Sequence, residues 1–254
     1  VIRRISELQL PRFQGRRACV IRAALGEFHG LCLTSEGAAL AWGTEQGPEV
    51  GLGSEALRRD LGRQLKGFPD SAALNQPEPR ALDLPCRVVD VAAGGYHSAL
   101  ITEDGRLWTW GGGDRGQLGH GINEPVVNRP RHVEAFKGQR VVSVSLGGFH
   151  TAARVAVAND RQDGGPSAGH ASCALFTWGD NKRGQCGHGE TILVDKPLRA
   201  TLARHEPLCL RVSCGGFFTI VEATGADAVD SAVSKFYVCG WGKEGCLGFG
   251  QPCK

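Results

Sequence analysis

The chain contains no methionine among its 254 residues, even at position 1, which predicts that it is an excerpt of a longer protein. No run of 18 or more apolar residues occurs, so no membrane span is expected. The first ten residues lack the apolar segment of a secretory signal. A formal charge of only +3 does not demand a nucleic-acid partner. These absences leave an ordinary globular protein that has no obligatory contact with membranes.

Catalytic and metal-binding signatures are also missing. Ten cysteines are present, but none are spaced as Cys-x-x-Cys, the close pairing typical of structural zinc sites. We interpret the cysteines as small buried hydrophobes and expect neither a metal nor another cofactor. Unpaired thiols indicate a reducing compartment, the cytoplasm or the nucleus. Since no Gly-rich phosphate loop, Gly-x-Ser-x-Gly elbow or His-Glu-x-x-His motif occurs, the sequence predicts a protein that is not an enzyme.

Four related segments repeat along the chain, and the clearest copy spans residues 94–121. An apolar run is followed by a turn at Asp104-Gly105 and by a second run that ends in Trp110. This arrangement predicts a β-hairpin. The loop that follows is rich in glycine. Without their insertions the repeats are units of roughly 50 residues with about four short strands each, a period typical of β-propeller blades.

The repeats share aromatic and histidine positions. One position recurs every 68 residues and holds Trp42, Trp110 and Trp178. A second position holds His29, His97 and His150, with Phe218 in the fourth copy. A catalytic histidine would not recur in successive repeats, so we interpret these rings as structural, bonding backbone groups. The indoles are expected to fill the space between neighbouring blades.

The residues GGYHSALITEDGRLWTWG, followed by GQLGHG, resemble the repeat of the regulator of chromosome condensation family, and WGDNKRGQCGHG at 178–189 keeps that pattern. The resemblance implies an all-β fold, a β-propeller of the regulator-of-chromosome-condensation type, which has seven blades in that family. About four blades of four-stranded antiparallel sheet are expected here. The prediction is a single propeller domain over 1–254, incomplete at both ends, with insertions at 54–85, 159–172 and 222–235.

Binding residues are expected in the equivalent loops of successive blades, because loops on a rigid frame commonly carry function. The predicted partner-binding residues are Asp114, Arg115, Asp180, Lys182, Arg183, Lys243 and Glu244. Their mixed charge suits a protein partner, which it would steer and orient. For each residue the alternative is a solvated rim that binds nothing.

Two functions from different classes stay open. We favour a protein–protein interaction scaffold that binds a protein partner through the rim loops. The alternative, implied by the resemblance, is a guanine nucleotide exchange factor for a Ran-like small GTPase, with 159–172 as the candidate β-wedge. A third hypothesis is that a group of arginines near the start of the chain contacts chromatin or nucleic acid. We prefer the alternative that these arginines form a basic edge that is exposed to solvent and binds neither. The arginines concerned are Arg3, Arg4, Arg12, Arg16, Arg17 and Arg22.

Overall fold

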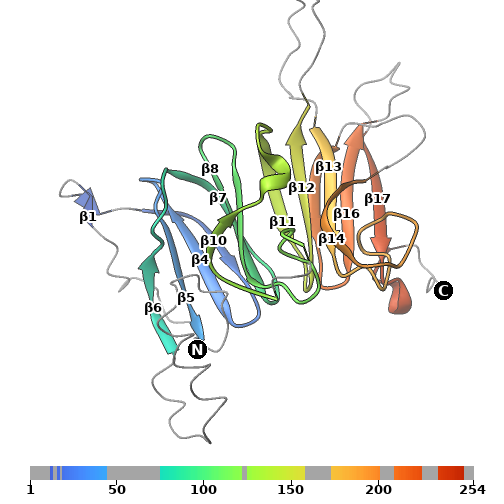
Figure 1. Cartoon of the computed structure of the whole chain (residues 1–254), viewed down its shortest axis with the longest axis horizontal. Helices are drawn as coiled ribbons and strands as arrows, with labels where there is room; N and C mark the ends of the chain where they lie inside the picture. Colours follow the sequence, from blue (N-terminus) through green and yellow to red (C-terminus); the bar gives the residue numbers. More distant parts are fainter. Residues whose placement is uncertain are drawn as a thin grey trace, which may run out of the picture.

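The computed structural model describes residues 12–13, 16–17, 19–44, 75–121, 125–157, 173–200, 209–224 and 234–248. Within these ranges it contains seventeen β-strands and two 3₁₀ helices, and no α-helix. The all-β prediction is therefore confirmed. Figure 1 shows twisted sheets that stand side by side along the molecule, as blades of an incomplete propeller.

Each blade is an antiparallel sheet whose strands follow one another in chain order. The first blade consists of β3 (Val20–Leu25), β4 (His29–Thr34), β5 (Ala39–Thr44) and β6 (Asn75–Ala81). The second consists of β7 (Val88–Ala93), β8 (His97–Thr102), β9 (Leu107–Gly112) and β10 (Val126–His132). The third consists of β11 (Val141–Leu146), β12 (His150–Ala156), β13 (Cys173–Gly179) and β14 (Val194–Arg199). The fourth has three strands among the described residues: β15 (Cys209–Cys214), β16 (Phe218–Thr224) and β17 (Ser234–Gly240).

The remaining elements are short. Strands β1 (Arg12–Phe13) and β2 (Arg16–Arg17) pair with each other, and the 3₁₀ helices are η3 (Glu134–Phe136) and η4 (Lys243–Gly245). The inner strands β3, β7, β11 and β15 pack against one another in succession, so they line the propeller axis. The chain thus forms four adjacent blades of one propeller.

The segment predicted as an insertion at 54–85 includes the outer strand of the first blade. Residues 75–81 pair with β5 as strand β6, although they include Pro77 and Pro79. Proline has no amide proton to donate, but an outer strand tolerates it. Strands β16 and β17 similarly enter the segment predicted at 222–235. Residues 54–74 and 159–172 lie outside the described part of the chain.

The hydrophobic core lies between the blades. One cluster joins blades one and two and includes Leu31, Val88 and Trp110, while another joins blades two and three around Trp178. Both indoles are fully buried, whereas Trp42 of the first blade is only partly buried. Burying one indole removes about 200 Å² from water, which is worth about 5 kcal/mol. The prediction that tryptophans fill the interblade space is therefore confirmed for the second and third blades.

Candidate functional site

Two sets of connections lie at one end of the blades. The inner turns 94–96, 147–149 and 215–217 join the first and second strands of their blades. The loops 113–121, 180–193 and 241–248 follow the third strands. Because β8 and β9 pair His97 with Gly111, both sets lie at the same end, at the bottom of the blades in Figure 1. We call this end the loop face, and the opposite end, with the hairpin turn 103–106, the turn face.

The repeated histidines connect neighbouring blades just beneath the loop face. His29 Nε2 lies 2.8 Å from Ser98 Oγ of the next blade, and His97 Nε2 lies 2.8 Å from Thr151 Oγ1. His150 Nε2 continues the series, 2.9 Å from the hydroxyl of Thr219. We call this series the histidine ladder. A structural role was predicted, but the bonding groups are hydroxyls of the following blade instead of backbone groups.

Hydrogen bonding fixes the tautomer of the His97 ring. The Thr151 hydroxyl donates to the backbone oxygen of Gln117 at 2.8 Å, and a hydroxyl has one proton. The ring of His97 must therefore donate through Nε2, and its Nδ1 carries a lone pair. Burial lowers the pKa of His97 to about 3 and that of His150 to about 4, although Asp180 opposes the shift at His150. Neutral, buried and engaged rings of this kind suit a framework role.

The glutamine of the Gly-Gln-Leu-Gly part of the repeat anchors the long loops of the second and third blades. Gln117 is fully buried, and its Oε1 accepts a hydrogen bond of 2.9 Å from the Arg115 amide. Its backbone oxygen accepts one of 2.9 Å from Trp178 Nε1 in the next blade. Gln185 repeats the first of these contacts with the Arg183 amide, also at 2.9 Å. The glutamines thus hold both arginines at the same place on successive blades.

Arg115 extends from the second blade onto the third. Its guanidinium carbon lies 3.9 Å from the centroid of the Phe149 ring, a distance typical of cation–π contact. The same guanidinium lies 3.6 Å from a carboxylate oxygen of Asp180 and 4.0 Å from one of Asp114. Two acids therefore surround one cation at this junction.

Arg183 makes the equivalent crossing from the third blade to the fourth. Its guanidinium carbon lies 4.4 Å from the Phe217 ring centroid and 4.1 Å from the Trp241 ring centroid. The two rings meet edge to face, with centroids 5.8 Å apart. This junction holds its arginine against two aromatic rings.

An aromatic residue in each inner turn, absent from the predicted site, supports the loop face. The rings of Tyr96 and Phe149 stack with centroids 4.8 Å apart, and Phe28 lies 5.9 Å from Tyr96. These residues occupy the place before the repeated histidine, as Phe217 does before Phe218. That shared aromatic position is visible in the sequence, and it could have identified these aromatic rings as part of the loop face.

The predicted site residues have different environments. The side chain of Asp114 is 63% exposed and that of Arg115 is 40% exposed, and Lys182, Arg183 and Lys243 are exposed. The side chain of Asp180 is only 5% exposed, which differs from the expected rim position. It accepts a 3.2 Å hydrogen bond from Gln185 and pairs with Arg115, so it positions that arginine. Glu244 belongs to η4, but its side chain lies outside the described part.

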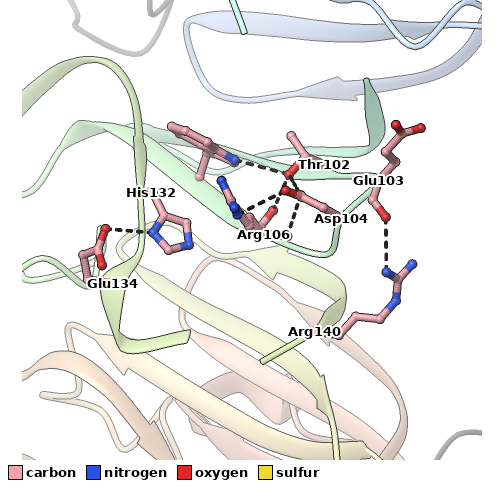
Figure 2. A network of polar contacts seen from close by, with 8 residues as sticks. Thr102, Glu103, Asp104, Arg106, His132, Glu134 and Arg140 are labelled. Carbon is pink, nitrogen blue, oxygen red and sulfur yellow. Dashed lines mark hydrogen bonds and ion pairs between the residues drawn. The ribbon is translucent and has the colours of Figure 1, made fainter. Parts of the chain in front are cut away.

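The turn face carries a polar network of a structural kind (Figure 2). The Thr102 hydroxyl donates to Asp104 at 2.6 Å and is the largest cause of the lowered pKa of that carboxyl. Arg106 pairs with the same carboxylate at 3.1 Å. Arg140 donates to the Glu103 backbone oxygen at 3.1 Å, which links the turn to the next blade. Such exposed pairs contribute little stability, and they order the hairpin turn.

Two further cysteines lie close to the loops of the third and fourth blades. Burial raises the pKa of Cys214 to about 12 and that of Cys239 to about 11, so both thiols stay protonated. Within the described ranges no group of three or more His, Cys, Asp or Glu side chains could hold a metal ion. No helix there is long and apolar enough to cross a bilayer. Arg22, one of the basic-edge arginines, pairs with Asp90 of the second blade.

Comparison with known families identifies the repeat. A family description, "Regulator of chromosome condensation (RCC1) repeat", matches residues 104–154 and 174–221. A second description of the same repeat matches residues 88–117. The matched segments contain His97 and His150 of the histidine ladder and the loops that carry Arg115 and Arg183.

Similar proteins are longer than this chain. The human E3 ubiquitin-protein ligase HERC2 is 30% identical over 217 residues, which is 85% of this chain and 4% of that protein. The Ultraviolet-B receptor UVR8 of Arabidopsis thaliana is 30% identical over 230 residues, 90% of this chain and 42% of the receptor. The chain therefore spans less than half the length of these relatives.

Solved propellers share the fold. Yeast RCC1 (Prp20), in a structure bound to Kap60, superposes with a TM-score of 0.65 at 21% identity. The match covers 95% of this chain and 47% of that protein. Human WBSCR16 gives a TM-score of 0.54 at 25% identity, with 80% and 44% covered. The expected propeller type is thereby confirmed.

Proposed function

Because the chain is built from regulator of chromosome condensation (RCC1) repeats, we propose that it is a non-catalytic interaction propeller that binds a protein partner through its loop face. The observation that carries the proposal is the pair of interblade arginine–aromatic contacts at Arg115 and Arg183. They place charged, partly exposed side chains at fixed positions on a face built from several blades. Arginine and aromatic side chains are enriched at protein interfaces and among the residues that dominate binding energy.

The loops are ordered before any partner arrives. Gly116 and Gly184 adopt φ values of +70° and +73°, which suit the tight turns after each arginine. Buried Gln117 and Gln185 then fix the backbone of the loops from below. A preformed surface loses little conformational entropy on binding, so more of its contact energy becomes affinity.

The proposed contact residues include the exposed Asp114, Lys182, Arg183 and Lys243 and the partly exposed Arg115. Glu244 is included because it follows Lys243 in the same loop. Asp180 contributes indirectly, because it orients Arg115. Both signs of charge are present, which allows a partner to be steered and oriented. The nine described cysteines form no disulfide with one another, which supports a cytoplasmic or nuclear location.

Site-specific photo-crosslinking in cells tests the proposal. A benzoylphenylalanine at position 114, 182 or 243 should capture a discrete protein partner on irradiation of the full-length protein. The same probe at Arg106 or Arg140 on the turn face is the matched control, because both side chains are exposed at the opposite end. Equal adducts from both faces, or adducts only from the turn face, would contradict the assignment.

Nucleotide exchange on a Ran-like small GTPase is the competing function. Its predicted wedge, residues 159–172, lies outside the described part of the chain, so the structure supplies no wedge geometry. The full-length protein can be added to a purified Ran-like GTPase loaded with fluorescent GDP. A scaffold should leave the rate of nucleotide release unchanged. Acceleration that disappears with Asp114→Ala would favour exchange activity over the scaffold.

A further inference from the structure

Arg115 and Arg183 occupy equivalent loop positions but differ in what surrounds their charge. Arg115 contacts the carboxylate of Asp180, the second residue after Trp178. In the next blade the corresponding residue is Trp241, and Arg183 contacts its indole at 4.1 Å. The structure thus repeats one arginine geometry with an acid at the first junction and an aromatic ring at the second.

The residue before each arginine accentuates this difference. Asp114 precedes Arg115 and pairs with it at 4.0 Å, whereas Lys182 precedes Arg183. Lys243 occupies the same loop position in the fourth blade, two residues beyond the indole that Arg183 contacts. At the same loop positions, the described side chains of the second junction therefore include three cations and no acid, while those of the first include two cations, Arg115 and Lys182, and two acids.

The guanidinium of Arg183 is held in place but has unfilled hydrogen-bonding capacity. Two rings fix its position, and no described side chain or backbone oxygen accepts a hydrogen bond from its N–H groups. A guanidinium edge presents parallel N–H donors that match the two oxygens of a carboxylate. Preorganised stacking reduces the entropy that such a bond would otherwise cost.

We propose that Arg183, together with Lys182 and Lys243, recognises an acidic, carboxylate-rich segment of the protein partner. This inference rests on the proposed function and names the chemistry of its partner. Charge complementarity supports it, because the acids that pair with Arg115 have no counterpart among the described side chains around Arg183.

A protein carboxylate fits the junction better than a nucleic acid does. Single-stranded nucleic acids bind through bases stacked on exposed aromatic faces. Here the rings of Phe217 and Trp241 already contact each other and the guanidinium. In addition, Asp114 on the neighbouring loop is exposed and would repel a phosphate backbone that followed the loop face.

Fluorescence anisotropy with defined probes tests this proposal on the full-length protein. The probes are a fluorescein-labelled peptide of alternating Glu and Gly, its Gln counterpart and an oligothymidylate of equal length. The Glu peptide should bind, the Gln peptide should not, and added salt should weaken binding. Arg183→Ala should lower the affinity for the Glu peptide by roughly 10- to 100-fold, as expected for a lost charge-assisted hydrogen bond.

Two further variants make the test specific. Arg140→Ala is the matched control and should change affinity less than about twofold, because Arg140 is an exposed arginine of the turn face, at the end opposite the proposed site. Trp241→Asp places an acid where the first junction has Asp180. The new carboxylate should pair with Arg183 and abolish peptide binding, although Arg183 itself is unchanged. Thermal melts followed by circular dichroism establish that each variant is folded. If Arg183→Ala does not fold, Trp241→Asp and the Lys182→Ala/Lys243→Ala pair decide the outcome.

Several results would overturn the inference. They are no binding of the Glu peptide, equal binding of the Gln peptide, tighter binding of the oligothymidylate, or equal losses in Arg140→Ala and Arg183→Ala. Crosslinks at positions 182 and 243 that persist alongside such a result would leave the proposed scaffold intact and refute only the acidic partner. Absence of any loop-face crosslink would instead refute the scaffold itself.

Discussion

Acidification should destabilise this propeller through its histidine ladder. Burial lowers the pKa of His29 and His150 to about 4 and that of His97 to about 3, below the usual value of 6.5. As the pH falls below 6.5, the unfolded chain takes up protons that the folded ladder cannot accept. Stability is therefore fully present above about pH 6.5 and is lost as the pH falls toward the folded pKa values.

The magnitude follows from the number of rings involved. Each buried histidine contributes a slope of about 1.4 kcal/mol per pH unit while its unfolded form is charged and its folded form is neutral. Three rings acting together give about 4 kcal/mol per pH unit. A stability of about 5–15 kcal/mol is ordinary for a folded protein, so two pH units remove a large part of it.

Urea unfolding followed by circular dichroism at closely spaced pH values measures this slope. His97→Phe, which copies the residue of the fourth blade, should reduce the slope by about one third. Val141→Ala serves as the control, because it should lower stability equally at every pH and leave the slope unchanged. A free energy of unfolding that stays flat between about pH 6.5 and 4.5 would refute the reasoning, as would a His97→Phe slope equal to that of the parent.

Three further predictions concern the contacts between blades. Trp178→Ala should lower the free energy of unfolding by about 3–5 kcal/mol, and Trp42→Ala should lower it by less, because only the indole of Trp178 is fully buried. Urea titrations compare the two variants, and equal losses would argue against interblade packing. Thr151→Val should cost about 1–3 kcal/mol, because it leaves the ring of its histidine partner without an acceptor, while Thr151→Ser should retain most of that stability in the same titration. Gly95→Ala should lower the melting temperature, because a Cβ there would lie 2.8 Å from the Gly148 backbone oxygen; an unchanged melt would contradict this tight approach.

Much of the fold was predictable because it is local and periodic. The Asp104-Gly105 turn between two apolar runs indicated the hairpin that the structure contains, and the period of Trp110 and Trp178 indicated repeated blades. Antiparallel neighbours within one blade are also neighbours in sequence, so turn chemistry and strand patterning largely specify them. The outer strand β6 was hidden because Pro77 and Pro79 weaken the usual strand pattern.

The candidate site depended on how one blade lies against the next. The sequence alone determined that charged residues fall in equivalent loops, and that the same position is aromatic in every inner turn. Only the tertiary structure decided that Asp180 is buried beside Arg115 and that Arg183 lies against Trp241. These contacts join residues from separate repeats, and their partners depend on the stacking geometry of whole sheets. No local pattern encodes that geometry, so identical loop positions acquired opposite electrostatic surroundings.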